Sequence, residues 1–237
     1  FSGWADAAEG ATSAVKFLQR KLQSKKFAEI DPEQFYDFSQ TRPHSSRTRD
    51  GKRRIHWPAN EFSHLTAGDT GSGIMVFSGV EPNLKWRTFS RTVARVAKEH
   101  GVRSVVHVGA LLDAVPHTRP VKLSGTASEP RLSEFLESQG IRSSNYQGPT
   151  GISSAVMDAC VKEGMEYTSI WGHTSHYLQA APNHQVGHTL LQILVKLLNL
   201  PLDVSELYSA AGIFNEEVAK AVAEDEQISS YVTKLEG

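Results

Sequence analysis

The loop that follows residues 102–108 holds the side chains best suited to chemistry. That apolar, β-branched run is typical of a strand covered on both faces of a parallel sheet. Asp113, His117 and Arg119 come soon after it. An imidazole exchanges protons near neutral pH, and a guanidinium holds anions. The three residues are therefore candidate catalytic groups, with Arg119 as an anion clamp, His117 as acid or base, and Asp113 orienting or opposing it.

Polar residues and glycines also collect after other predicted strand ends, in the ranges 4–9, 79–82 and 171–176. Carboxyl ends of strands in an open α/β sheet form the crevice in which ligands bind, so these loops are expected to meet at one edge. The stretch 148–151 opens a helix nearby, and free helix N–H groups attract anions. The expected crevice residues are Trp4, Asp6, Glu9, Glu81, Thr118, Gly148, Thr150, His173 and His176. The competing interpretation is that the prolines and glycines only shape tight connections.

Motifs for other chemistries are missing or incomplete. The sequence has no Gly-x-Ser-x-Gly, phosphate-loop, zincin or dinucleotide-binding motif, so no cofactor is predicted. His184 and His188 have the spacing of zinc ligands, but no carboxylate lies between Trp171 and Lys196 to act as a base, and no metal is predicted. The range 69–72 imitates an aspartic-protease loop, yet that chemistry needs two copies, and a loose turn is expected instead.

The composition limits the possible partners and compartments. The chain has 237 residues with 25 Lys and Arg against 26 Asp and Glu, and this balance predicts no nucleic-acid partner. The longest apolar-rich stretch, 190–200, is too short to cross a bilayer, so no membrane partner is predicted. The single cysteine, Cys160, cannot form an intrachain disulfide and is expected on the buried side of a helix. This use of cysteine indicates a reducing compartment.

The order of the predicted elements favours an α/β fold with a mainly parallel sheet. A strand at 74–78, a helix with Pro82 as its first residue and a strand at 102–108 imply a right-handed crossover. The range 41–57 reads as an inserted hairpin, because Asp50-Gly51 is a strong two-residue turn. A solvated ribbon is the expected setting of its basic residues and an acidic partner the alternative. These residues are Arg47, Arg49, Lys52, Arg53 and Arg54.

The last predicted helix repeats apolar residues in alternating steps of four and three, which is a heptad seam with one defect at Asp225. The seam either packs back onto its own domain or contacts another subunit or partner. The candidate contact residues are Leu207, Phe214, Val218 and Ile228. We therefore expect an α/β core over residues 1–203, with the hairpin near 41–57 as an insertion, and a C-terminal helical extension over 204–237.

Several sequence blocks are distinctive in combination. They are Gly3-Trp4-x-Asp6-Ala7, Ile30-Asp31-Pro32-Glu33-x-Phe35-Tyr36-Asp37-Phe38, Thr41-Arg42-Pro43, Trp57-Pro58-Ala59-Asn60-Glu61, Gly79-x-Glu81-Pro82, Gly109-Ala110-Leu111-Leu112-x-x-Val115-Pro116-His117-Thr118-Arg119-Pro120 and Tyr146-x-Gly148-Pro149-Thr150-Gly151-Ile152. In this order they resemble the proteasome-assembly-chaperone-two family in its actinobacterial form. The resemblance implies a three-layer α/β sandwich of phosphorylase/hydrolase-like type, a homo-oligomer with trimers as the expected size, and a cytoplasmic setting.

Two classes of function follow. The resemblance implies a non-enzymatic oligomeric scaffold or chaperone, because relatives of the family hold proteasome subunits, and its partners would be further copies of the chain and proteasome subunits. The loops at the strand ends support an alternative, which is a hydrolase- or ligase-like enzyme or a small-molecule binder that uses the crevice. The missing catalytic motifs favour the scaffold.

Overall fold

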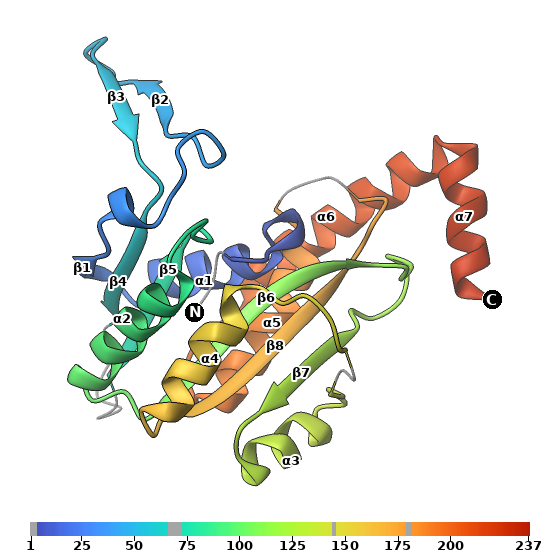
Figure 1. Ribbon diagram of the computed structural model, residues 1–237. Helices are drawn as coiled ribbons and strands as arrows, with labels where there is room; N and C mark the ends of the chain where they lie inside the picture. Colours follow the sequence, from blue (N-terminus) through green and yellow to red (C-terminus); the bar gives the residue numbers. More distant parts are fainter. Residues whose placement is uncertain (1–3, 66–72, 144–145, 179–181) are drawn as a thin grey trace.

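The computed structural model describes residues 4–65, 73–143, 146–178 and 182–237 (Figure 1). The loop expected at 69–72 lies outside the described residues. Two three-stranded sheets form the centre of the molecule. The first contains β1 (Lys25–Glu29), β4 (Asn60–Leu65) and β5 (Ile74–Gly79), in the order β1-β4-β5. The second contains β6 (Ser104–Asp113), β7 (Leu123–Ala127) and β8 (Glu166–Ser175), in the order β6-β8-β7.

The prediction of a mainly parallel sheet is wrong. All strand pairs of the first sheet are antiparallel, and in the second only β6 and β8 run parallel, while β7 is antiparallel to β8. Chain length explains part of this result. Only eight residues separate β4 from β5, and a parallel crossover needs a dozen or more. The expected unit of strand, helix and strand at 74–108 also fails, because β5 and β6 belong to different sheets.

The segment around Trp4 connects the two sheets. The Ala5 carbonyl accepts a hydrogen bond from the Ala110 N–H of β6 at 3.0 Å. The Trp4 ring lies 5.5 Å from Phe77 of β5 and 5.9 Å from His107 of β6. Only 8% of Trp4 is exposed. Trp4 is therefore a core residue that holds the sheets together, and not the crevice residue that the sequence predicted.

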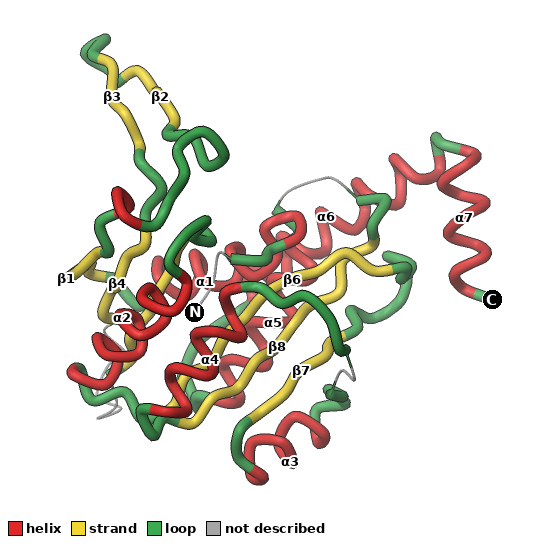
Figure 2. The backbone as a smooth tube through the Cα atoms, in the orientation of Figure 1, coloured by secondary structure: helices red, strands yellow, loops and turns green. Residues whose placement is uncertain are grey.

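Helices cover both faces of the second sheet, as Figure 2 shows. One face is covered by α1 (Gly10–Lys21) and α5 (His184–Leu197). On the opposite face lie α2 (Trp86–Glu99) and α4 (Ile152–Lys162), and α3 (Pro130–Ser138) lies beside β7. Val108 and Ile170 point into the core under α1 and α5, whereas Val105 and Tyr167 point to the opposite face. This alternation is the period of two expected for strands buried on both faces. Short 3-10 helices, η1 (Ala7–Glu9) and η2 (Pro32–Gln34), precede α1 and follow β1.

The start of α2 differs from the prediction that Pro82 would be its first residue. The helix begins at Trp86, after Lys85 in a left-handed conformation with φ of 54°. The N–H groups of Asn83 and Leu84 both donate to the Phe35 carbonyl at 3.0 Å. These bonds tie residues 83–84 to another segment and keep them out of the helical pattern.

A hairpin formed by β2 (His44–Arg47) and β3 (Arg53–His56) projects from the body (Figure 1). We call residues 41–57 the arm. The turn is longer than the two-residue type that the sequence predicted. Thr48 N–H donates to the Lys52 carbonyl and Gly51 N–H to the Thr48 carbonyl, both at 2.9 Å, and Gly51 has φ of 81°. This is a three-residue loop with glycine at its left-handed position, a common alternative to the two-residue turn.

The predicted heptad helix is bent into two helices at its apparent defect. The first helix, α6 (Ser205–Ala223), ends two residues before Asp225, and α7 (Glu226–Glu236) follows. The Asp225 carboxylate accepts the N–H groups of Gln227 and Ile228 at 2.9 and 3.0 Å, as an N-cap does. We call residues 214–232 the elbow. Among the described helices, none is long and apolar enough to cross a membrane.

Candidate functional site

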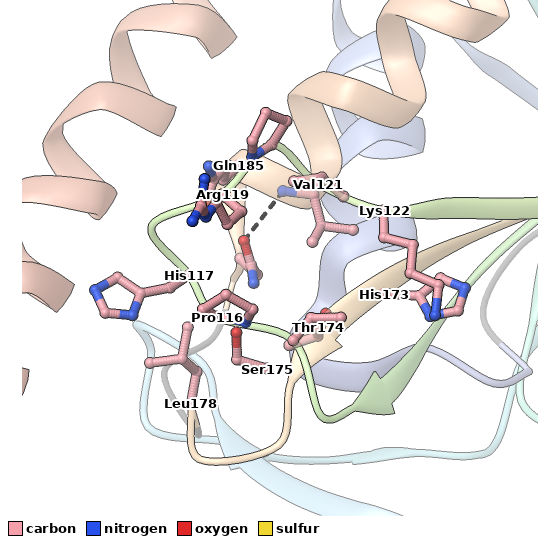
Figure 3. Close-up of a pocket in the computed structure, with 14 residues that line it drawn as sticks. Pro116, His117, Arg119, Val121, Lys122, His173, Thr174, Ser175, Leu178 and Gln185 are labelled. Atoms are coloured by element: carbon pink, nitrogen blue, oxygen red, sulfur yellow. Dashed lines mark hydrogen bonds between the residues drawn. The ribbon is translucent and has the colours of Figure 1, made fainter. Parts of the chain in front are cut away.

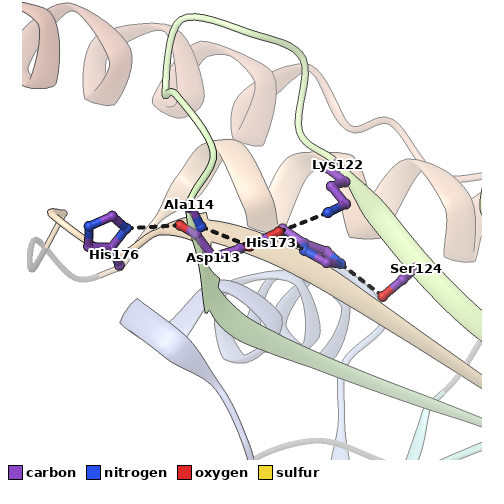
Figure 4. Close-up of polar contacts among 6 residues, drawn as sticks. All are labelled: Asp113, Ala114, Lys122, Ser124, His173 and His176. Carbon is purple, nitrogen blue, oxygen red and sulfur yellow. Dashed lines mark hydrogen bonds and ion pairs between the residues drawn. The ribbon is translucent and has the colours of Figure 1, made fainter. Parts of the chain in front are cut away.

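Asp113, Ser124 and His173 meet on one face of the second sheet (Figure 4). In the strand registers Leu111 lies opposite His173 and Ser124 opposite Trp171. Because side chains alternate between faces, these pairings place the carboxyl, hydroxyl and imidazole groups on the same side. His173 Nδ1 lies 2.7 Å from an Asp113 carboxylate oxygen, and His173 Nε2 lies 2.8 Å from Ser124 Oγ.

The proton positions in this cluster follow from its charges. Burial acts to raise the pKa of Asp113, but hydrogen bonds from Lys122, His173 and the Ala114 N–H outweigh burial and lower it to about 2. The ionised carboxylate can only accept, so His173 Nδ1 carries the proton and donates it to Asp113. When the ring is neutral, His173 Nε2 has a free lone pair and accepts a hydrogen bond from the Ser124 hydroxyl. This is the arrangement of a serine, a general base and an orienting carboxylate.

The predicted catalytic group of Asp113, His117 and Arg119 is not assembled. The His117 ring bonds to the Tyr177 hydroxyl at 2.8 Å, and burial lowers the pKa of His117. Arg119 donates to the Glu236 backbone carbonyl at 3.3 Å, and Thr118 donates to the Glu236 carboxylate. This loop therefore binds the end of α7 through Thr118 and Arg119, whereas Asp113 forms a hydrogen bond with His173.

A cavity of about 140 Å³ lies under the loop between β6 and β7 (Figure 3). His117 and His173 stand on opposite sides of it, and Arg119, Thr174 and Gln185 also line it. Ligand pockets for larger small molecules usually have about 300–1,000 Å³. The cavity is below this range, which limits it to water, an ion or another very small ligand.

The helix N-terminus expected to bind an anion already holds one. Glu81 accepts the Ile152 N–H of α4 at 2.7 Å, so the chain's own carboxylate occupies the end that Gly148 and Thr150 lead into. Thr150 itself bonds to Ser154. Glu81 therefore caps α4 from within the chain, and the helix dipole is already matched by a negative charge.

A carboxylate of the chain also caps the N-terminus of α1. The Asp6 carboxylate accepts the Ala11 and Thr12 N–H groups at 2.7 and 2.6 Å. Burial raises the pKa of Asp6. Ala8 and Glu9 precede the helix with φ of 52° each, and α1 begins at Gly10. The exposed Glu9 side chain pairs with Lys16 at 3.5 Å and does not line a crevice with Asp6.

The remaining predicted residues have contacts within the chain. His176 Nδ1 lies 3.2 Å from the Asp113 carbonyl oxygen. Leu207 packs in the core of the second sheet, and Phe214, Val218 and Ile228 pack together at the elbow. Cys160 is fully buried as expected, and burial raises the pKa of its thiol to about 12. A contact of the four apolar residues with another subunit stays a prediction.

Sequence reasoning missed Ser124. It lies on β7, an edge strand for which the sequence made no prediction, and 49 positions separate it from His173. The partnership depends on the antiparallel pairing of β7 with β8. A Ser-Gly step in a short strand gives no local signal of that pairing.

Comparisons with known proteins place the whole arrangement in one family. The model of the PAC2 family matches residues 1–222. A structure of a Mycobacterium tuberculosis proteasome-assembly chaperone homologue is 34% identical, with a TM-score of 0.86, over 98% of this chain and 97% of that one. A PAC2 family protein from Streptomyces avermitilis is also 34% identical, with a TM-score of 0.85 and the same coverage.

An archaeal proteasome activator from Pyrococcus furiosus shares the fold, with a TM-score of 0.71 and 17% identity over 92% of this chain and 91% of that one. No curated protein matches the chain. The family match spans most of the sequence, and the two bacterial structures cover nearly all of it. The chain therefore belongs to the PAC2 family, the family that its sequence blocks resemble.

Proposed function

We propose that the protein is a cytoplasmic, oligomeric scaffold or chaperone that acts on proteasome subunits. The observation that carries this proposal is the 34% identity, over nearly the full length, to a protein described as a proteasome-assembly chaperone homologue. A trimer is the proposed size of the oligomer. The related archaeal activator shares the fold and is itself a proteasome-directed protein, which supports the same class of partner.

The geometry supports a function in protein binding over one in binding a small ligand. The carboxylates of Asp6 and Glu81 occupy the ends of α1 and α4, and the cavity beside His173 is small. By contrast, the arm exposes Ile55 and Trp57, with 57% and 50% of these residues accessible. Exposed apolar side chains on a projecting element are typical of protein contacts.

The test is affinity capture of the tagged full-length chain from extracts of its native host, with the proteins identified by mass spectrometry. We expect proteasome subunits of the α type, or partly assembled particles, to be enriched over a tag-only control. The captured complex should also contain several copies of the chain. Failure to enrich any proteasome subunit, at low as well as moderate salt, would contradict the proposal.

A second function is favoured by the cluster of Ser124, His173 and Asp113, which is hydrolysis of small carboxylic esters. In this reaction Ser124 Oγ bonds to the ester carbonyl carbon while His173 Nε2 takes the hydroxyl proton. The carbon–oxygen bond to the alcohol then breaks, and the alcohol leaves with that proton. Water next attacks the acyl group, releases the carboxylic acid and restores the serine hydroxyl.

A fluorophosphonate probe tests this reactivity directly, because it labels serines that a neighbouring base activates. We expect labelling of the wild-type protein at Ser124, none in Ser124→Ala, and a rate lower by roughly 1,000-fold or more in His173→Gln. The exposed Ser230 on α7 provides the matched control, and Ser230→Ala should label as the wild type does. Equal, background labelling of the wild type and Ser124→Ala would exclude an activated serine.

A further inference from the structure

The arm has the exposure and charge of a surface that another molecule covers. Every residue of β2 and β3 is exposed, and the two strands pair only with each other in the part of the chain that the structure describes. An isolated two-stranded hairpin is at best marginally stable in water. Residues 41–57 contain six Arg and Lys against one Asp, so the arm has a net charge of +5 with histidines neutral. Ile55 adds an exposed apolar side chain near its base.

The elbow has the complementary properties. A groove of about 330 Å³ lies along α6 and α7, with walls from Tyr177, Phe214, Val218 and Ile228. Residues 204–237 contain seven Asp and Glu against two Lys, a net charge of −5. Five of these acidic side chains are exposed around the bend, and none of the five forms an ion pair with the described residues. They are Glu216, Glu217, Glu224, Asp225 and Glu226.

The arm and the elbow lie at opposite ends of the molecule (Figure 1). The arm therefore cannot reach the elbow of its own chain, although the two surfaces match in charge and in apolar character. A contact between two different surfaces of identical chains repeats from copy to copy, and it closes into a ring when the rotation fits. A ring is also the simplest arrangement for a small odd number of copies.

We propose that the arm of one copy docks into the elbow groove of a second copy. This inference rests on the proposed oligomeric scaffold and specifies the surfaces that hold it together. Ile55 supplies an apolar side chain for the groove. Arg47 and Arg53 are opposite each other in the hairpin and share the face of Ile55, so they face the acidic residues at the edge of the groove. The opposite charges of the partner surface offset the repulsion among the like charges within the arm and within the elbow. The contact also covers the hairpin, which accounts for the stability of an otherwise exposed arm.

Charge exchange in the full-length chain tests the contact. Arg47→Glu with Arg53→Glu lowers the net charge of the arm from +5 to +1, and Glu217→Lys with Glu224→Lys changes that of residues 204–237 from −5 to −1. Each pair of reversed charges should raise the dissociation constant of the oligomer on the order of 100-fold. Combining all four substitutions sets the new glutamates against the new lysines, and we expect it to restore the oligomer. Sedimentation velocity and native mass spectrometry report the size in each case.

Two controls separate this contact from general effects of charge. Arg87→Glu with Arg91→Glu makes the same change of charge on the exposed side of α2 and should leave the oligomer intact. Ile55→Ser keeps every charge and should still weaken the oligomer, because it removes the apolar contact. Circular dichroism confirms that each variant is folded.

The results distinguish this contact from the proposed function. A monomeric wild type, or an oligomer that both reversals leave unchanged, would overturn the docking of arm and elbow. Failure of the four-fold variant to reassemble would do the same. If the charge exchange behaves as expected but affinity capture returns no proteasome subunit, the contact stands and the proposed partner is wrong.

Discussion

Replacing Phe89 with alanine is expected to lower the free energy of unfolding by about 3–5 kcal/mol. Phe89 is completely buried, and its ring centroid lies 5.4 Å from that of Phe35, 6.2 Å from Trp4 and 6.3 Å from Phe77. These rings come from four separate segments, so a cavity at Phe89 cannot close by moving a single helix. Urea unfolding followed by fluorescence measures the loss.

The matched control is Leu84→Ala. Leu84 lies five residues before Phe89 but is 48% exposed, so its removal should change the free energy of unfolding by less than about 0.5 kcal/mol. A cost below about 1 kcal/mol for Phe89→Ala would show that the aromatic cluster repacks around the missing ring. The cluster would then not be the rigid connection between the sheets that its geometry indicates.

The second large effect is expected from Gly109→Val on β6. A β-carbon at this position would lie 2.5 Å from the Trp171 ring and 2.9 Å from the Ala5 carbonyl oxygen. The Ala5 carbonyl accepts the Ala110 N–H, which ties the N-terminal segment to β6. Valine must displace both neighbours, and we expect a loss of about 3 kcal/mol in unfolding free energy.

Gly212 in the middle of α6 provides the opposite case. A β-carbon there meets nothing within 4 Å, so Gly212→Ala should stabilise the protein by about 0.5–1 kcal/mol through its effect on the backbone. Thermal unfolding of the two variants side by side tests the difference. If Gly109→Val were as stable as the wild type, the close approach of Ala5, Gly109 and Trp171 would have to be wrong.

Local patterns predicted many elements of the fold correctly. Most of the β-branched run at 102–108 lies in β6, as a strand was expected there, and Gly101 follows the end of α2 with φ of 72°. The hairpin in the arm also formed near Asp50-Gly51, although its loop has one more residue. These features depend on short-range chemistry. Strand direction and sheet order depend on contacts between distant segments, and there the prediction of a mainly parallel sheet failed.

The candidate site was predicted in part. Asp113 and His173 were both expected in loops that follow strands. The structure places them within β6 and β8 instead, and it brings them within hydrogen-bond distance of each other. The assignment of His117 as the partner of Asp113 was wrong, because neighbours in sequence are not neighbours across the sheet. Glu81 was expected to line the crevice, but it caps α4 instead. The identity of a capping carboxylate 71 positions away cannot be read from the helix that it caps.

The bend at Asp225 has a consequence for exchange between chains. The spacing of Phe214, Val218 and Ile228 continues the heptad pattern across the bend, so a straight helix would still present one apolar stripe. An N-cap such as that of Asp225 contributes only about 1 kcal/mol. Two chains that straighten here can swap their α7 helices and rebuild the same cluster with exchanged partners. One side chain thus separates a helix that folds back on its own chain from a domain-swapped pair.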